Sequence, residues 1–204
     1  MTKKLVIIGF VLALSAPALA QIPYQVGGFK LGGSIGDVTG QVKMETAIPI
    51  RYQAYLSEVE IEDSPFFKSG LITYGTCQDA GRIVRIKLKY ADSSETFFDQ
   101  LRDRIKARYG KPDEWRGDSF GIVKAWKWSF RDQSGSRISL TLQHNTRDDE
   151  EKKGNAIKMT MHNLVEDERR CYEKKEHSRR AAESVSKAAK PGSQKPDWDL
   201  LVPK

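Results

Sequence analysis

Histidine and cysteine are scarce in this chain, whose 204 residues include three histidines and two cysteines. His144, His162 and His177 fit neither H-E-x-x-H nor H-x-H, and the cysteines do not form a C-x-x-C pair. The acidic run at residues 148–151 lacks the glycine-containing spacing of a calcium loop. These absences exclude the usual zinc, calcium and thiol-redox motifs, so we predict no metal ligand and no cofactor.

Long apolar runs are missing after residue 20, so we predict no membrane span in the rest of the chain. Within residues 1–20, Lys3 and Lys4 precede an apolar segment, and Ala18-Leu19-Ala20 follows it. This order is typical of a secretory signal peptide cleaved near Ala20. We therefore expect a periplasmic or secreted protein; a retained N-terminal anchor is the alternative.

Strong charge asymmetry is also absent. Lysine and arginine number 34 against 27 acids, a formal charge of +7, and both signs are interspersed along the chain. Without a clustered basic stripe, such a surplus mainly favours solubility, and we predict no nucleic-acid partner.

Alternating polarity is the main structural signal. In residues 83–90, Val84, Ile86, Leu88 and Tyr90 share one face, and Arg85, Lys87 and Lys89 share the other, which predicts a half-buried strand. Similar patterns predict strands within 52–61, 71–77, 120–131, 138–142 and 157–161, the last with Lys158, Thr160 and His162 on its polar face. The glycine-rich residues 21–47 predict only a short strand near 28–32 and a short helix near 34–38.

A helix over 93–109 is the best-defined element. Phe97, Leu101, Ile105 and Tyr109 recur every four residues, and Gly110 and Pro112 end the pattern. Asp92 with Glu95 resembles a capping box, so we predict Asp92 as the N-cap. A second helix, over about 164–189, is rich in charged residues and lacks an apolar stripe in its second half.

These elements predict an α+β fold with a largely antiparallel sheet, one packed helix at about 93–109 and a long C-terminal helix. We divide the chain into a signal peptide (1–20), a single α+β domain (21–172), and a solvated helix with a disordered tail (173–204). The sequence leaves strand order and oligomeric state open.

Cys77 and Cys171 are the only cysteines, and export would place them where disulfides form. We predict a structural disulfide that closes a loop of roughly 90 residues and contributes about 4–5 kcal/mol by the chain-entropy relation. A redox couple and two free thiols are the alternatives.

The aromatic residues Trp115, Trp126 and Trp128 are a possible binding surface. Trp126 and Trp128 lie two residues apart and therefore share a strand face. That face is either sheet core against the 93–109 helix or an exposed platform, and the sequence leaves both open.

Catalytic patterns are weak, and we assign no catalytic residue. Ser119 lies in a G-x-S-x-G sequence, but a strand follows it where a nucleophile elbow needs a helix. We interpret His144 and His162 as exposed histidines at strand ends, with an approach between them as the alternative. Ser119 and His144 are the candidates if the protein is a hydrolase.

The sequence Phe97-x3-Leu101-x3-Ile105-x3-Tyr109-Gly110-Lys111-Pro112, with Leu31-Gly32 and Ser34 to Val38, resembles small exported bacterial α+β modules of the BamE-like and β-lactamase-inhibitor-like kind. The resemblance covers about residues 28–130, and the lipid-anchoring cysteine of many outer-membrane examples is missing. It implies architecture, and by analogy a binding or assembly role.

We therefore interpret the chain as a non-enzymatic exported module that binds a protein or cell-envelope component through one sheet face or through the terminal helix. A hydrolase with an unrecognised active site and a redox-sensitive envelope stress factor are the alternatives.

Overall fold

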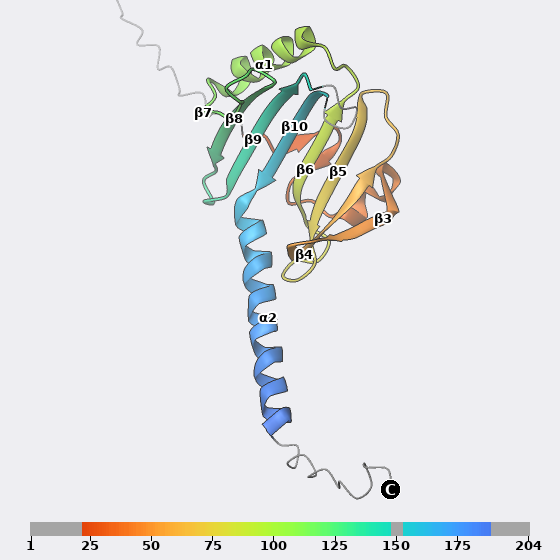
Figure 1. The fold of residues 1–204 in the computed structure, drawn as a ribbon, viewed down its shortest axis with the longest axis vertical. Helices are drawn as coiled ribbons and strands as arrows, with labels where there is room; N and C mark the ends of the chain where they lie inside the picture. Colours follow the sequence, from red (N-terminus) through yellow and green to blue (C-terminus); the bar gives the residue numbers. More distant parts are fainter. Residues whose placement is uncertain (1–21, 148–152, 189–204) are drawn as a thin grey trace, which may run out of the picture.

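The computed structural model describes residues 22–147 and 153–188. The predicted signal peptide, the acidic run at 148–151 and the tail from 189 onward lie outside these residues. Eight strands form one antiparallel sheet, and two short strands form a separate hairpin (Figure 1). With a packed helix and a long C-terminal helix, this arrangement confirms the predicted α+β class.

Ten strands, two α-helices and one 3-10 helix follow one another along the described chain. They are β1 (Gln25–Val26), β2 (Phe29–Lys30), η1 (Ile35–Gln41), β3 (Val42–Ile50), β4 (Gln53–Ile61), β5 (Phe67–Gly75), β6 (Ile83–Tyr90), α1 (Glu95–Tyr109), β7 (Glu114–Trp115), β8 (Val123–Arg131), β9 (Arg137–Asn145), β10 (Gly154–Met161) and α2 (His162–Ala188).

The large sheet consists of two meanders that meet in its middle. Its strand order is β3-β4-β5-β6-β10-β9-β8-β7, so β6 and β10 are neighbours although α1 and three strands separate them in sequence. Their register sets Lys158 opposite Lys87 and Thr160 opposite Arg85. Residues directly opposite in an antiparallel pair share a face, so these four side chains lie on one side of the sheet.

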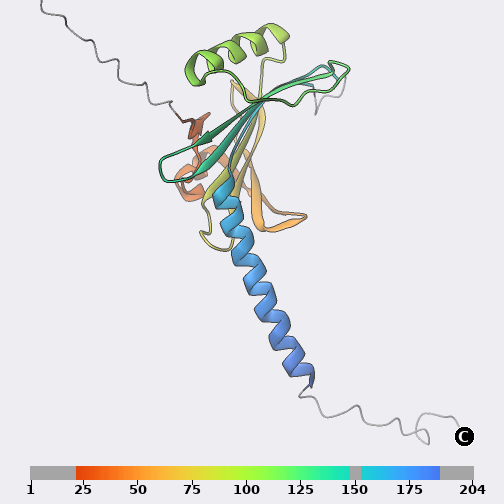
Figure 2. The same cartoon turned by 90° about the vertical axis from the view of Figure 1, so that its left-hand side faces the viewer.

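The other side of the sheet carries the core. The predicted alternation in β6 is confirmed, because Val84, Ile86 and Leu88 are buried there. α1 packs on this side through Phe98 and Ile105, and the β1–β2 hairpin and η1 lie on it too (Figure 2). Among the residues that the structure describes, no helix crosses the centre of the open side (Figure 1).

Ser94, and not Asp92, is the N-cap of α1. The Ser94 hydroxyl accepts a hydrogen bond from the Phe97 N–H at 3.2 Å, as N-cap serines do. Asp92 lies two residues earlier and accepts from the Ser94 N–H at 2.8 Å. The predicted N-cap was therefore wrong by two residues. Ser94 takes the capping role because its hydroxyl lies three residues before the Phe97 N–H that it accepts.

Three strands, β1, β3 and β7, were not predicted. β3 begins inside the glycine-rich residues 21–47, where no strand was predicted after residue 32, and its pairing with β4 shifts register between Lys43 and Ile48. Such a bulge breaks the alternation by which a strand is recognised. β1 and β7 have only two residues each, too few to show any period.

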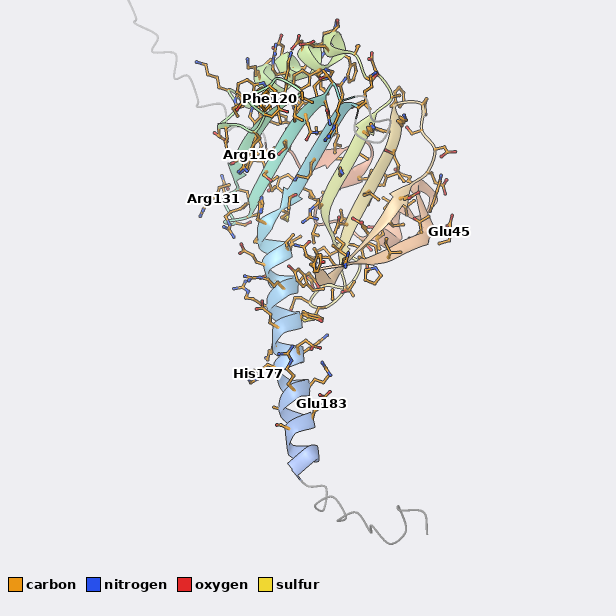
Figure 3. The ribbon with its side chains drawn as sticks, viewed as in Figure 1. Glu45, Arg116, Phe120, Arg131, His177 and Glu183 are labelled. Carbon is orange, nitrogen blue, oxygen red and sulfur yellow. A yellow bond between two sulfur atoms is a disulfide. The ribbon has the colours of Figure 1, made fainter. Side chains whose placement is uncertain are left out.

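α2 follows β10 without a loop and runs far beyond the sheet (Figures 1 and 2). Its first turns contact β4, β5, β6 and β9. Farther along, His177 and Glu183 project from the part that leaves the body (Figure 3), and residues 173–184 are exposed except for the half-buried Glu176. No helix among the described residues is both long and apolar enough to cross a membrane.

Candidate functional site

The open side of the sheet carries a concentration of positive charge. We call it the basic face and define it by Arg85 and Lys87 on β6, Lys158 on β10, Lys127 on β8 and Arg116 beside β7. All five line one cavity of about 980 Å³, and the label of Arg116 in Figure 3 marks its β7 end.

The strand register produces the basic face. Lys87 lies opposite Lys158, Lys158 opposite Thr141, and Thr141 opposite Lys127, so one row of side chains crosses four strands. Directly opposed like charges destabilise a sheet by a few tenths of a kcal/mol to about 1 kcal/mol. The Lys87–Lys158 pair is therefore unfavourable for the fold by itself.

Acidic residues lie at the two ends of this surface. At the β7 edge, Glu114 pairs with Arg116 at 2.7 Å and with Lys127 at 3.4 Å. On β4, Glu58 lines the same cavity. In the centre, Arg85, Lys87 and Lys158 form no ion pair within the described part of the chain.

The pKa of Lys158 shows the effect of this clustering. Burial is the main cause that lowers it, followed by the positive charges of Arg85, Lys87, Arg116 and Lys127. The side chain is exposed by surface area, yet the surrounding protein limits the solvation of its ammonium group. An anion bound beside Lys158 would offset this unfavourable environment and stabilise the charged ammonium group.

His162 lies at the α2 end of the basic face. Its Nε2 is 2.8 Å from the Ser139 hydroxyl, and burial, then Arg137 and Lys127, lower its pKa; Glu166 opposes this and Arg85 adds to it. The neutral imidazole is therefore favoured here to lower pH than in solution.

The base of α2 is anchored next to the basic face. A disulfide joins Cys77 to Cys171 with a Cα–Cα distance of 5.9 Å, which confirms the predicted bridge. One turn earlier, the Glu168 side chain is 2% exposed and accepts four backbone N–H groups, at 2.6–3.1 Å, from residues 76–79. Gly75 leaves room for it, because an added Cβ would lie 2.4 Å from the carboxyl carbon.

The predicted tryptophan surface is divided between core and solvent. Trp128 is 1% exposed and donates its indole N–H to the Gly110 carbonyl at 2.9 Å, which ties β8 to the end of α1. Trp126 is partly buried against the same core. Trp115 is 44% exposed, with its ring 4.6 Å from that of Trp126.

His144 is not an exposed strand-end residue. It is 4% exposed, and its Nδ1 lies 2.7 Å from the Asn155 side-chain oxygen. Since the Asn155 amide nitrogen donates to the Asp92 and Ser94 carbonyls, Nδ1 must be the donor to that oxygen. His144 thus belongs to the core side, and it lies near the opposite end of β9 from His162, so the two do not meet.

Ser119 lies in the turn between β7 and β8. The Asp118 carboxylate organises this turn by accepting the N–H groups of Phe120, Ile122 and Val123. The segment that follows Ser119 is a strand, so the strand–elbow–helix arrangement of a serine nucleophile is not formed.

Within the described ranges, no group of three or more His, Cys, Asp or Glu side chains could hold a metal ion. No protein-family model, no curated protein and no solved structure matches this chain.

Sequence reasoning found the polar faces of β6 and β10 separately but missed the basic face. The two strands are about 70 residues apart in sequence, and only their pairing brings Lys158 to Lys87. The available signal was that both predicted strands carry lysine on their polar face.

Proposed function

We propose that this protein is an exported, non-enzymatic binding module whose basic face recognises an anionic partner. The observation that carries the proposal is the Lys87–Lys158 pair, which opposes two like charges at the centre of the sheet; neither lysine forms an ion pair with any described residue. Residues that destabilise the fold and line an open cavity, as these two lysines do, are typical of a binding site.

Export is supported by the Cys77–Cys171 disulfide, which is typical of oxidising compartments. The sequence of residues 1–20 also supports it. An anionic protein and an anionic envelope component both suit such a location. The resemblance to BamE-like and β-lactamase-inhibitor-like modules would agree with a binding role.

The concave shape of the site favours the basic face over α2 as the recognition surface. The exposed second half of α2 carries lysine, arginine and glutamate together, and Arg179 pairs with both Glu176 and Glu183. Charges neutralised within one helix attract an external anion weakly.

The test is a Lys87→Gln/Lys158→Gln variant titrated with fluorescent poly-L-glutamate at low salt. We expect affinity to fall at least tenfold, because two of the amines that would contact the polymer are removed. We expect the free energy of unfolding to rise by about 0.5 kcal/mol, since the like-charge contact is relieved.

The matched control is Lys174→Gln, on the exposed part of α2. It should change affinity by less than twofold. Equal binding by the double variant and the wild type would refute the proposal. So would a loss of binding that is explained by unfolding of the double variant.

A further inference from the structure

The centre of the basic face concentrates three cationic side chains in two adjacent cross-strand pairs. Lys87 faces Lys158, and Arg85 faces Thr160 one position along the same face. Opposed Cβ atoms in antiparallel sheets are about 5 Å apart. A single small anion could therefore contact Arg85, Lys87 and Lys158 together.

Two threonine hydroxyls flank Arg85 on this face. Thr73 on β5 and Thr160 on β10 are both its cross-strand partners, and they are 1% and 6% exposed. Neither side chain forms a hydrogen bond within the described part of the chain. Every fully buried side-chain nitrogen or oxygen there has a partner, so these two hydroxyls must reach the cavity surface.

Unused hydroxyl donors beside a guanidinium suit an anion with several acceptor oxygens. A carboxylate offers two oxygens and one charge, whereas a phosphate monoester offers three terminal oxygens and about −1.5 to −2 charge at neutral pH. Two opposed lysines need close to two negative charges to be neutralised. The donors and the charge therefore match phosphate better than carboxylate or a singly charged sulfate ester.

The residues that line the cavity include no phenylalanine, tyrosine or tryptophan in the described part of the chain. Sugars and bases bind proteins largely by stacking on such rings. Recognition here would depend on the anionic group and not on a ring attached to it.

We infer that the anion recognised by the basic face is a phosphate monoester, bound at the β6–β10 pair by Arg85, Lys87, Lys158 and Thr160. This inference rests on the proposed function and names the chemical class of its ligand. The phosphate would stand either on a small soluble molecule or on a lipid headgroup.

The experiment is an NMR titration of the full chain with inorganic phosphate and acetate at constant ionic strength. Phosphate should bind at least tenfold more tightly than acetate at pH 7.5. It should also raise the pKa of His162, because a bound dianion offsets the positive charges of Arg137, Lys127 and Arg85 that face this ring alongside Glu166.

Thr160→Val removes one hydroxyl and keeps the side-chain size. Because a hydrogen bond to a charged group is stronger than one between neutral groups, we expect phosphate affinity to fall about tenfold or more. Thr96→Val, on the exposed side of α1, is the control and should leave affinity unchanged. Melting curves of both variants separate a loss of binding from a loss of folding.

Two further arms identify the source of the phosphate. Tighter binding of glycerol phosphate than of phosphatidate vesicles supports a soluble ligand, and the reverse order supports a lipid headgroup. Binding of poly-L-glutamate with no preference for phosphate over acetate would overturn this inference and leave the proposed function standing. If phosphate, acetate and poly-L-glutamate all fail to bind, both this inference and the proposed function are overturned.

Discussion

Replacing Glu168 with alanine should reduce the free energy of unfolding by about 3–5 kcal/mol. The carboxylate accepts N–H groups from Thr76, Cys77, Gln78 and Asp79, and each would lose a charged acceptor. Hydrogen bonds to charged groups contribute about 1.5–3 kcal/mol each, and solvent entering the space would recover part of this. Such a loss is a large fraction of the stability of an ordinary domain.

Glu168→Gln distinguishes the hydrogen bonds from simple packing. Glutamine keeps the size but replaces one carboxylate oxygen with an amide NH2, which would face either the Asp79 N–H or the N–H groups of residues 76–78. We expect a loss of about 2–3 kcal/mol, measured by urea unfolding with the disulfide intact. Glu173→Gln, on the same helix and exposed, should cost less than 1 kcal/mol. Equal effects at the two positions would contradict this role for Glu168.

Removing the Cys77–Cys171 disulfide should have a comparable effect. The two residues are 94 positions apart, and the chain-entropy relation gives about 4–5 kcal/mol for a loop of that length. We therefore expect Cys77→Ser/Cys171→Ser to shift the urea midpoint strongly downward. The cause lies mainly in the unfolded chain, which gains freedom when the bridge is absent.

A reducing agent provides the control for this experiment. It should lower the stability of the wild-type protein towards that of the double variant and leave the variant itself unchanged. A double variant within 1 kcal/mol of the oxidised wild type would show that the Glu168 contacts alone hold the base of α2.

Local patterns correctly predicted the strands and helices whose periodicity is visible within their own residues. The alternation in β6 separated Ile86 from Lys87 correctly, and the spacing from Phe97 to Tyr109 located α1 to within two residues. Both patterns follow directly from burial of one face of a regular element. The cysteine pair was predictable because only one pairing exists.

The candidate site depends on contacts that no local pattern contains. The pairing of β6 with β10 joins two meanders across α1, and it alone sets Lys158 against Lys87. Glu168 is one of 27 acids, and its burial becomes visible only when the loop at residues 76–79 is placed beside α2. His144 was assigned to the surface because the predicted strand ended at Leu142. β9 continues to Asn145 and keeps His144 on the buried face of Ile138, Leu140 and Leu142.

Recognition of anions by the basic face is tested most directly by mapping where an anionic polymer touches the molecule. Backbone amide resonances of the ¹⁵N-labelled chain would be followed during addition of poly-L-glutamate. We expect the largest shifts in β6 and β10, around Lys87 and Lys158, with little change in α1 or in residues 173–184. Shifts confined to the exposed part of α2, or spread evenly over all basic residues, would contradict this expectation.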